Sequence, residues 1–386
     1  MRFGGAPYFN FKKMKNLIFS LILITLVNCS GGHKEEKFEL LWDFSYSKPA
    51  DGGSLITASP TLTNQGLLIA PDEQFSMLST ESGDLLWQFE FPSNQFIIVN
   101  EYLIDGEKLF AKEDKLNELF NIDLKTGDTI WKEKSETRKF FQHTNDGQDQ
   151  EYLYIIGYDY EVFRYTKSGI FDKRYDIANY SIDTDARSLR VLNNQLIFSQ
   201  RFRGDQCPSR TCGRILSIDK ETEEVLWEYR TENGGFIFEP ILLEDEIIYA
   251  GVTDGPGEFV ALNANNGEVI WKTLGIIGQS YTLTDSMVLV NGGVSLYALD
   301  KFTGKELWNT GLKFGGGHGQ DNIAYLDGYV YHAHSGRLYV LDARNGEIVH
   351  SEERSPDGSP FGLLTAGNGK VFVQTDVALY AYTAWE

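Results

Sequence analysis

The sequence predicts an all-β protein, an eight-bladed β-propeller built from four-stranded antiparallel blades. Three observations support this fold class. The chain contains 25 Phe, 20 Tyr and 38 Gly, a composition that suits strands joined by tight turns. Hydrophobic residues make up 42% of it and charged residues 23%, which is enough to bury a large core. A motif that ends in tryptophan also recurs at intervals typical of one propeller blade.

The first segment has the features of a secretory signal peptide. Residues 1–28 contain no acid, and three lysines precede an apolar run at residues 17–27. That run is too short to span a bilayer, which takes about 20 residues of helix. Met14 is a second candidate start, so residues 1–13 are an N-terminal extension or a misassigned start. Residues 14–28 are then the signal peptide.

The next segment carries a candidate lipid anchor. The sequence Leu26-Val27-Asn28-Cys29 resembles a bacterial lipobox, in which the cysteine is lipidated after cleavage. Asn28 departs from the small residue usually found there, and a secreted protein with an incidental cysteine is the alternative. Lipidation of Cys29 would hold the protein on a membrane through a polar tether at residues 29–37.

The remaining chain, residues 38–386, repeats itself. Six segments share one pattern. An apolar residue is followed by Asp or another small polar residue, and a Trp or His stands eight positions after that polar residue. Gly occupies the middle of five of them. The polar residue would open a turn, Gly would take a positive φ, and Trp would fill the space between neighbouring blades. The segments end at Trp87, Trp131, Trp227, Trp271, Trp308 and His350.

The blade count follows from the spacing of these segments. Trp131 and Trp227 lie 96 residues apart, which is two repeats, and a degenerate copy ending at Lys173 fills the gap. An eighth unit begins near Phe361 and stops before its own outer strand. Residues 40–44, which include Trp42, can supply that strand and close the ring. We therefore expect one domain of eight blades; seven blades, with the degenerate unit misread, is the alternative.

The charge of the chain limits its partners. The leader removes Arg2 and three lysines but no acid, so the formal net charge moves from −20 to −24. Binding to nucleic acid depends mostly on basic residues that neutralise phosphates, so we expect no nucleic-acid partner. Adsorption to an anionic lipid surface by charge alone is disfavoured for the same reason.

Residues 123–131 and 300–308 both read Asp-x-x-Thr-Gly-x-x-x-Trp. This resembles the repeat of the PQQ-like (pyrroloquinoline quinone-like) β-propellers, and the resemblance covers essentially the whole mature chain. The family includes quinone-dependent alcohol dehydrogenases, with adjacent cysteines over the cofactor, calcium-binding carboxylates and a catalytic Asp. Here four residues separate Cys207 from Cys212, and no acid can be matched by position.

The family also includes the propeller lipoprotein of the outer-membrane β-barrel assembly machinery. This chain is similar to it in length, lipid anchor, number of blades and absence of a cofactor site. The resemblance therefore implies a scaffold without cofactor in the cell envelope. One fold can host many functions, so the specific role depends on the site rather than on the fold.

Cys207 and Cys212 lie in the longest insertion, residues 201–214 of the fourth blade. In an oxidising envelope they are expected to form a disulfide, since a redox-active pair needs closer spacing. The same insertion carries a group of arginines on an otherwise acidic protein. They are either ordinary solvated arginines or a docking surface for a partner. These candidate partner-binding residues are Arg201, Arg203, Arg210 and Arg214.

Three histidines form a weak candidate metal site. His332 and His334 are two residues apart on an expected strand and therefore share a face. His318, in the glycine-rich stretch 315–319, belongs to the same blade. Three imidazoles could bind zinc. The alternative is a polar strand face beside a flexible loop, because no further ligand follows at a recognised spacing.

The sequence contains no recognised catalytic motif, which favours a protein without catalytic activity. We expect a monomeric, membrane-anchored envelope lipoprotein, on the outer membrane, whose propeller is a scaffold for an envelope or outer-membrane protein. The role implied by the resemblance is outer-membrane protein assembly. The alternative is a divergent quinone-dependent oxidoreductase, or a carbohydrate-binding or carbohydrate-active propeller, with its site at the channel mouth. The sequence does not identify the partner, the binding face, a channel ligand or the orientation of the anchor.

Overall fold

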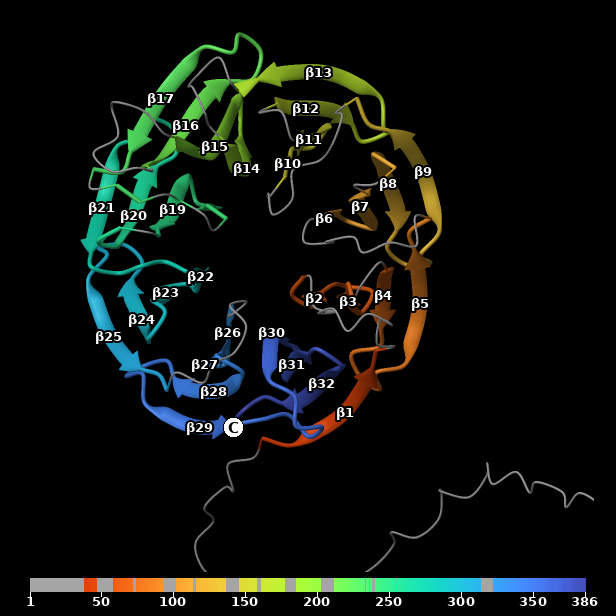
Figure 1. Cartoon of the computed structure of the whole chain (residues 1–386), viewed down its shortest axis with the longest axis vertical. Helices are drawn as coiled ribbons and strands as arrows, with labels where there is room; N and C mark the ends of the chain where they lie inside the picture. Colours follow the sequence, from red (N-terminus) through yellow and green to blue (C-terminus); the bar gives the residue numbers. More distant parts are fainter. Residues whose placement is uncertain are drawn as a thin grey trace, which may run out of the picture. The chain divides into compact units, whose positions relative to one another are not determined.

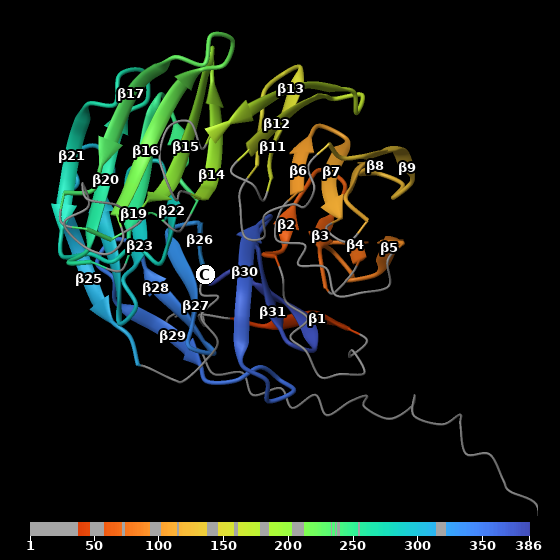
Figure 2. The same cartoon turned by 45° about the horizontal axis from the view of Figure 1, so that its top comes forward.

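The computed structural model is a ring of eight four-stranded antiparallel sheets, with the strands of each sheet following one another from the centre of the ring outward (Figure 1). Figure 2 shows the four strands of one blade, β14 to β17, side by side. The structure describes residues 38–46, 58–71, 74–92, 102–113, 116–136, 146–157, 161–177, 185–202, 212–232, 234–235, 237, 240–253, 255–313 and 322–386.

The blades are numbered in chain order. Blade 1 holds β2 (Thr61–Leu62), β3 (Leu67–Ile69), β4 (Gln74–Leu78) and β5 (Leu85–Glu90). Blade 2 holds β6 (Tyr102–Asp105), β7 (Lys108–Glu113), β8 (Glu118–Asp123) and β9 (Thr129–Lys134). Blade 3 holds β10 (Gly147–Gln148), β11 (Tyr152–Ile156), β12 (Glu161–Thr166) and β13 (Phe171–Asp176). Blade 4 holds β14 (Asp185–Leu192), β15 (Gln195–Phe202), β16 (Cys212–Asp219) and β17 (Val225–Arg230).

The second half of the ring follows the same order. Blade 5 holds β18 (Leu242–Glu244), β19 (Ile247–Val252), β20 (Glu258–Asn263) and β21 (Val269–Leu274). Blade 6 holds β22 (Ser280–Leu283), β23 (Met287–Asn291), β24 (Ser295–Asp300) and β25 (Glu306–Gly311). Blade 7 holds β26 (Asn322–Leu326), β27 (Tyr329–His334), β28 (Arg337–Asp342) and β29 (Ile348–Glu352). Blade 8 holds β30 (Phe361–Gly367), β31 (Lys370–Thr375), β32 (Ala378–Thr383) and, from the other end of the chain, β1 (Leu40–Ser45).

The two ends of the described chain close the ring together. Strand β1 pairs antiparallel with β32, with Asp43 opposite Tyr380 and Ser45 opposite Ala378. The backbone N–H of Thr383 also donates to the carbonyl oxygen of Glu39 at 2.9 Å. The predicted eight blades and the predicted closing strand are both confirmed, and the seven-blade alternative is wrong.

The core is divided among the interfaces between blades. In the described part of the chain, each of the eight interfaces contains one cluster of buried apolar residues contributed by the two blades that meet there. Successive strand residues serve opposite interfaces, because side chains alternate between the faces of a sheet. Met77 packs toward blade 2, whereas its neighbour Leu78 packs toward blade 8.

The turns of the repeat have the predicted local chemistry. In blade 2, one carboxylate oxygen of Asp123 accepts the backbone N–H groups of Lys125 and Thr126, both at 2.9 Å. Gly127 then takes a φ of +77°, a conformation that a residue without a Cβ adopts at no steric cost. Among the described residues no helix is long and apolar enough to cross a bilayer.

Candidate functional site

The tryptophans of the repeat each clamp the following blade. The Trp87 indole Nε1 donates to the Leu124 carbonyl of blade 2 at 3.0 Å. Its ring lies against Gly127, where an added Cβ would be 2.7 Å from a ring carbon. The same hydrogen bond runs from Trp42 to Thr80 (3.3 Å), Trp131 to Lys167 (3.1 Å), Trp227 to Ala264 (3.1 Å), Trp271 to Lys301 (3.0 Å) and Trp308 to Ala343 (2.8 Å).

Two of the eight junctions lack this indole. Between blades 7 and 8, His350 takes the tryptophan position and packs against two aromatic rings. Its ring centroid lies 5.1 Å from that of Trp385 and 5.3 Å from that of Phe38. This junction therefore remains aromatic, although its residues differ from the repeat.

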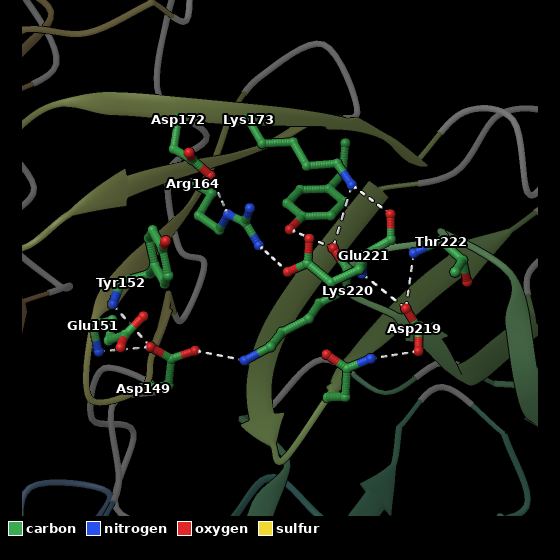
Figure 3. Close-up of polar contacts among 12 residues, drawn as sticks. Asp149, Glu151, Tyr152, Arg164, Asp172, Lys173, Asp219, Lys220, Glu221 and Thr222 are labelled. Carbon is green, nitrogen blue, oxygen red and sulfur yellow. Dashed lines mark hydrogen bonds and ion pairs between the residues drawn. The ribbon is translucent and has the colours of Figure 1, made fainter.

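The junction between blades 3 and 4 is ionic instead (Figure 3). Lys173 stands at the tryptophan position, and Glu223 stands at the glycine position with a φ of +63°. The Lys173 ammonium donates to the carbonyls of Lys220 at 3.3 Å and Glu221 at 3.0 Å. It also lies 3.0 Å from the Glu223 carboxylate. The Lys220 carbonyl corresponds to the one that the indole reaches at the other junctions, so Lys173 makes the same hydrogen bond with a charged group.

Arg164 links the two blades at the same junction. Its guanidinium lies 2.5 Å from the Asp172 carboxylate of its own blade and 2.7 Å from the Glu221 carboxylate of blade 4. It also stacks 4.6 Å above the Tyr152 ring. Burial alone would lower the pKa of Arg164, but the bonds to Glu221 and Asp172 outweigh burial and raise it. Arg164 therefore stays charged and makes an electrostatic contact across the junction.

Asp149 supplies a further contact across it. Its carboxylate lies 3.0 Å from the Lys220 ammonium of blade 4 and accepts the backbone N–H groups of Glu151 and Tyr152. Burial by itself would raise the pKa of Asp149. The bonds from these two backbone groups, from Lys220 and from the Tyr154 hydroxyl outweigh it and hold the pKa below the ordinary value of 3.8. The charged form is thus stabilised by folding.

This lowered pKa gives the protein an acid-sensitive contribution to stability. Because the folded pKa of Asp149 lies below its unfolded value, the contribution is present above the unfolded pKa and is lost as pH falls through the folded pKa. Asp149→Asn should therefore lower the free energy of unfolding by about 1–2 kcal/mol at pH 7, and by much less at pH 3. Urea unfolding at both pH values measures this. Asp128→Asn, at an exposed turn of blade 2, is the control, and an equal loss at both pH values for Asp149→Asn would contradict the prediction.

Polar side chains on the inner strands join neighbouring blades. The Tyr102 hydroxyl lies 2.6 Å from Thr61 Oγ1, and burial raises the pKa of Tyr102 to about 12. Asn322 makes two hydrogen bonds with the backbone of Leu364, at 2.7 and 2.8 Å. Within the described ranges no three His, Cys, Asp or Glu side chains gather to hold a metal ion.

The structure places two of the three candidate histidines together. His332 and His334 are buried on β27 with their ring centroids 5.4 Å apart. Nδ1 of His332 lies 2.9 Å from the Asn322 carbonyl oxygen, so this imidazole is already engaged inside blade 7. His318 lies outside the described residues, and the zinc site stays a prediction.

The arginine-rich insertion is partly described. Cys212 is buried and disulfide-bonded, but its predicted partner Cys207 lies outside the described residues, as does Cys29. Arg214 is only 3% exposed, and its guanidinium donates to Gln200 at 2.6 Å and Glu228 at 3.0 Å.

The prediction of a docking surface therefore needs a correction at Arg214. The insertion overlaps the end of β15 and the start of β16, so Arg214 lies on β16, where it is buried and bonded within blade 4. Arg201 is half-buried on β15. Arg203 and Arg210 lie outside the described residues, and their role in docking stays a prediction.

Exposed aliphatic and aromatic residues surround the ring at or just before the start of each outer strand. In blades 1 to 7 they directly follow the turn of the repeat, and in blade 8 they lie at the start of β1, so a similar surface recurs in every blade. We call this set the outer belt; its members are between 39% and 66% exposed. The outer belt consists of Leu40, Leu41, Leu85, Leu86, Ile130, Ile170, Phe171, Val225, Leu226, Val269, Ile270, Leu307 and Ile348.

Known proteins share this architecture. The chain matches the family described as outer membrane protein assembly factor BamB over residues 37–273 and 291–384. No curated protein matches the sequence significantly.

Among solved structures, the crystal structure of BamB from Moraxella catarrhalis has a TM-score of 0.64 at 14% identity, covering 90% of this chain and 98% of that one. The quinohemoprotein alcohol dehydrogenase from Comamonas testosteroni has a TM-score of 0.66 at 11% identity, covering 90% of this chain and 76% of that one. The computationally designed protein Ika8 has a TM-score of 0.61 at 14% identity, covering 86% and 96%. At these identities the likeness of the structures concerns the fold alone.

Proposed function

Because this chain belongs to the family of outer membrane protein assembly factor BamB, we propose that it is a non-catalytic scaffold for the assembly of outer-membrane proteins. In this proposal Cys29 carries the lipid anchor, which tethers the propeller to the outer membrane. The anchor raises the local concentration of the propeller beside a membrane-embedded partner, so that modest contacts suffice for binding.

The family match over almost the whole propeller is the observation that carries this proposal. The two natural structures, at 14% and 11% identity, support the propeller fold and do not decide between the two functions.

The surface of the propeller also suits a scaffold. The outer belt offers exposed apolar side chains in every blade, and such side chains can be buried by a partner. The arginines that remain candidates for docking are Arg201, Arg203 and Arg210. On a protein with a formal net charge of −20, they would favour an acidic site on the partner.

Affinity capture tests the proposal. The full chain, purified with its anchor from its own envelope, should co-purify the membrane-embedded subunit of the β-barrel assembly machinery. Arg203→Ala with Arg210→Ala should weaken this binding on the order of tenfold. Lys125→Ala with Lys305→Ala removes the same charge from exposed turns of blades 2 and 6 and should leave binding unchanged.

Two results would overturn parts of the proposal separately. If neither the full chain nor the Lys125→Ala, Lys305→Ala control captures an assembly subunit, and the full chain binds pyrroloquinoline quinone saturably, the oxidoreductase alternative would replace the scaffold. Mass spectrometry of the purified protein tests the anchor, because a mature chain that begins at Cys29 with bound lipid has a predictable mass. An N-terminus without lipid would show that the proposed anchor at Cys29 is wrong. The capture experiment would then test the scaffold function of the propeller by itself.

A further inference from the structure

We propose that the propeller has one salt-sensitive junction, the rim between blades 3 and 4, and that this rim loosens reversibly as ionic strength rises while the other junctions stay closed. We call it the 3–4 seam and define it by Asp149, Arg164, Lys173, Lys220, Glu221 and Glu223. The inference rests on the fold and does not depend on the proposed function.

The first step is the chemistry of the other junctions. Six are clamped by an indole that packs on the next blade, and the junction of blades 7 and 8 is closed by the ring contacts of His350. Packing of aromatic rings is driven by removal of apolar surface from water, which salt does not screen. Ion pairs also cross some of these junctions, such as Lys167 with Asp105 and Lys370 with Glu81. There they add to an indole and do not replace it.

The second step is the number of charges at the 3–4 seam. Among the described residues, three ion pairs cross it: Lys173 with Glu223, Arg164 with Glu221, and Lys220 with Asp149. Glu221 is 56% exposed and Glu223 is 36% exposed, so solvent ions reach these two pairs, whereas Lys220 and Asp149 are only 18% and 21% exposed. Exposed pairs weaken as the screening length falls from about 10 Å at 0.1 M salt to about 3 Å at 1 M.

The third step is the inner part of the same interface, which remains apolar. Tyr154 of blade 3 and Phe198 and Leu216 of blade 4 belong to one buried cluster, which Tyr175 of the outer strand β13 also joins. That cluster keeps the two blades together when the charged rim is weakened. The expected motion is therefore an opening of the rim about the inner cluster, without separation of the blades.

The 3–4 seam already has the backbone geometry and the hydrogen-bond acceptor that a tryptophan at position 173 would need. Lys173 hydrogen-bonds the Lys220 carbonyl, the acceptor that the indole uses elsewhere, and the Tyr175 hydroxyl donates to the same carbonyl at 2.9 Å. Glu223 already has the positive φ of the missing glycine, a conformation that costs a side-chain-bearing residue energy. Lys173→Trp with Glu223→Gly should therefore convert the 3–4 seam into an ordinary junction of this ring.

Hydrogen exchange of the full chain at 0.05 M and 0.5 M NaCl tests the inference. Raising the salt should speed exchange on the order of tenfold in peptides covering β13 and residues 219–224. Peptides covering β21, β25 and their turns, at the clamped junctions of blades 5 to 7, provide the internal reference and should not change. A uniform change across all blades would overturn the inference.

Variants complete the test. Lys173→Trp with Glu223→Gly should abolish the salt dependence, whereas Lys132→Trp, which adds an indole at an exposed position of β9, should leave it intact.

If the variant with Lys173→Trp and Glu223→Gly does not fold, the exchange of charges in Lys173→Glu with Glu223→Lys serves instead. Lys173→Glu alone should leave the seam open at both salt concentrations, and adding Glu223→Lys should restore the salt response. Persistence of the full response in the variant with Lys173→Trp and Glu223→Gly, or in Lys173→Glu alone, would also overturn the inference.

Discussion

Replacing Trp271 with alanine is expected to lower the free energy of unfolding by about 3–5 kcal/mol. The indole is 7% exposed and lies between blades 5 and 6. Its ring stacks against Phe259 at a centroid distance of 6.1 Å, and its N–H donates to the Lys301 carbonyl at 3.0 Å. On the far side it packs on Gly304, which has no side chain that could move into the space left behind. The substitution therefore creates a cavity and leaves a carbonyl without its donor.

Denaturant unfolding followed by circular dichroism measures this effect. Leu274→Ala is a matched control because it removes a large apolar side chain from the same strand at a position that is 64% exposed. The control should change the free energy of unfolding by less than about 0.5 kcal/mol. Equal losses for the two variants would show that the indole does not clamp the blades.

Removal of the closing strand is expected to have the second large effect. A chain that lacks residues 38–46 loses β1 and exposes the hydrogen-bonding edge of β32. It also loses Trp42 and Phe44, which pack on the apolar cluster between blades 8 and 1. We expect the melting temperature to fall by roughly 10 °C or more. We also expect the exposed edge to pair between molecules, as unpaired strand edges do.

Scanning calorimetry and light scattering measure these two outcomes. A synthetic peptide with the sequence of residues 37–47, added in excess, should bind the open blade, raise the melting temperature and suppress association. The same peptide with Trp42→Ala should bind less tightly, since its ring clamps blade 1. A shortened chain that melts like the full chain would contradict closure by β1.

The sequence predicts the fold well because the fold is repetitive. One motif records, in every blade, where the turn forms, which residue has a positive φ and which ring reaches the next blade. Even the missing outer strand of blade 8 is visible, because Trp42 has no upstream repeat of its own. These features depend on neighbours along the chain or on a fixed period, and both can be recognised in a single sequence.

The contacts of the 3–4 seam and the burial of Arg214 are harder to predict from the sequence. Lys173 reads as a degenerate repeat, but its role depends on Glu223, Arg164 and Asp149, which come from separate strands without a common period. Arg214 reads as part of a loop because the length of the β15–β16 hairpin is not encoded in the repeat. The outer belt is visible as apolar residues before each Trp. Its exposure is a property of the folded ring, in which no described strand lies outside the outer strands.

The closure of blade 8 also limits the order in which the propeller can fold. Strand β1 precedes all the other described strands along the chain, and β32, to which it pairs, follows them all. The bond between Glu39 and Thr383 spans 344 residues, so β1 has no partner until the far end of the propeller is in place. Blades 1 to 7 can form one after another from local contacts, whereas the ring is completed in a single late step.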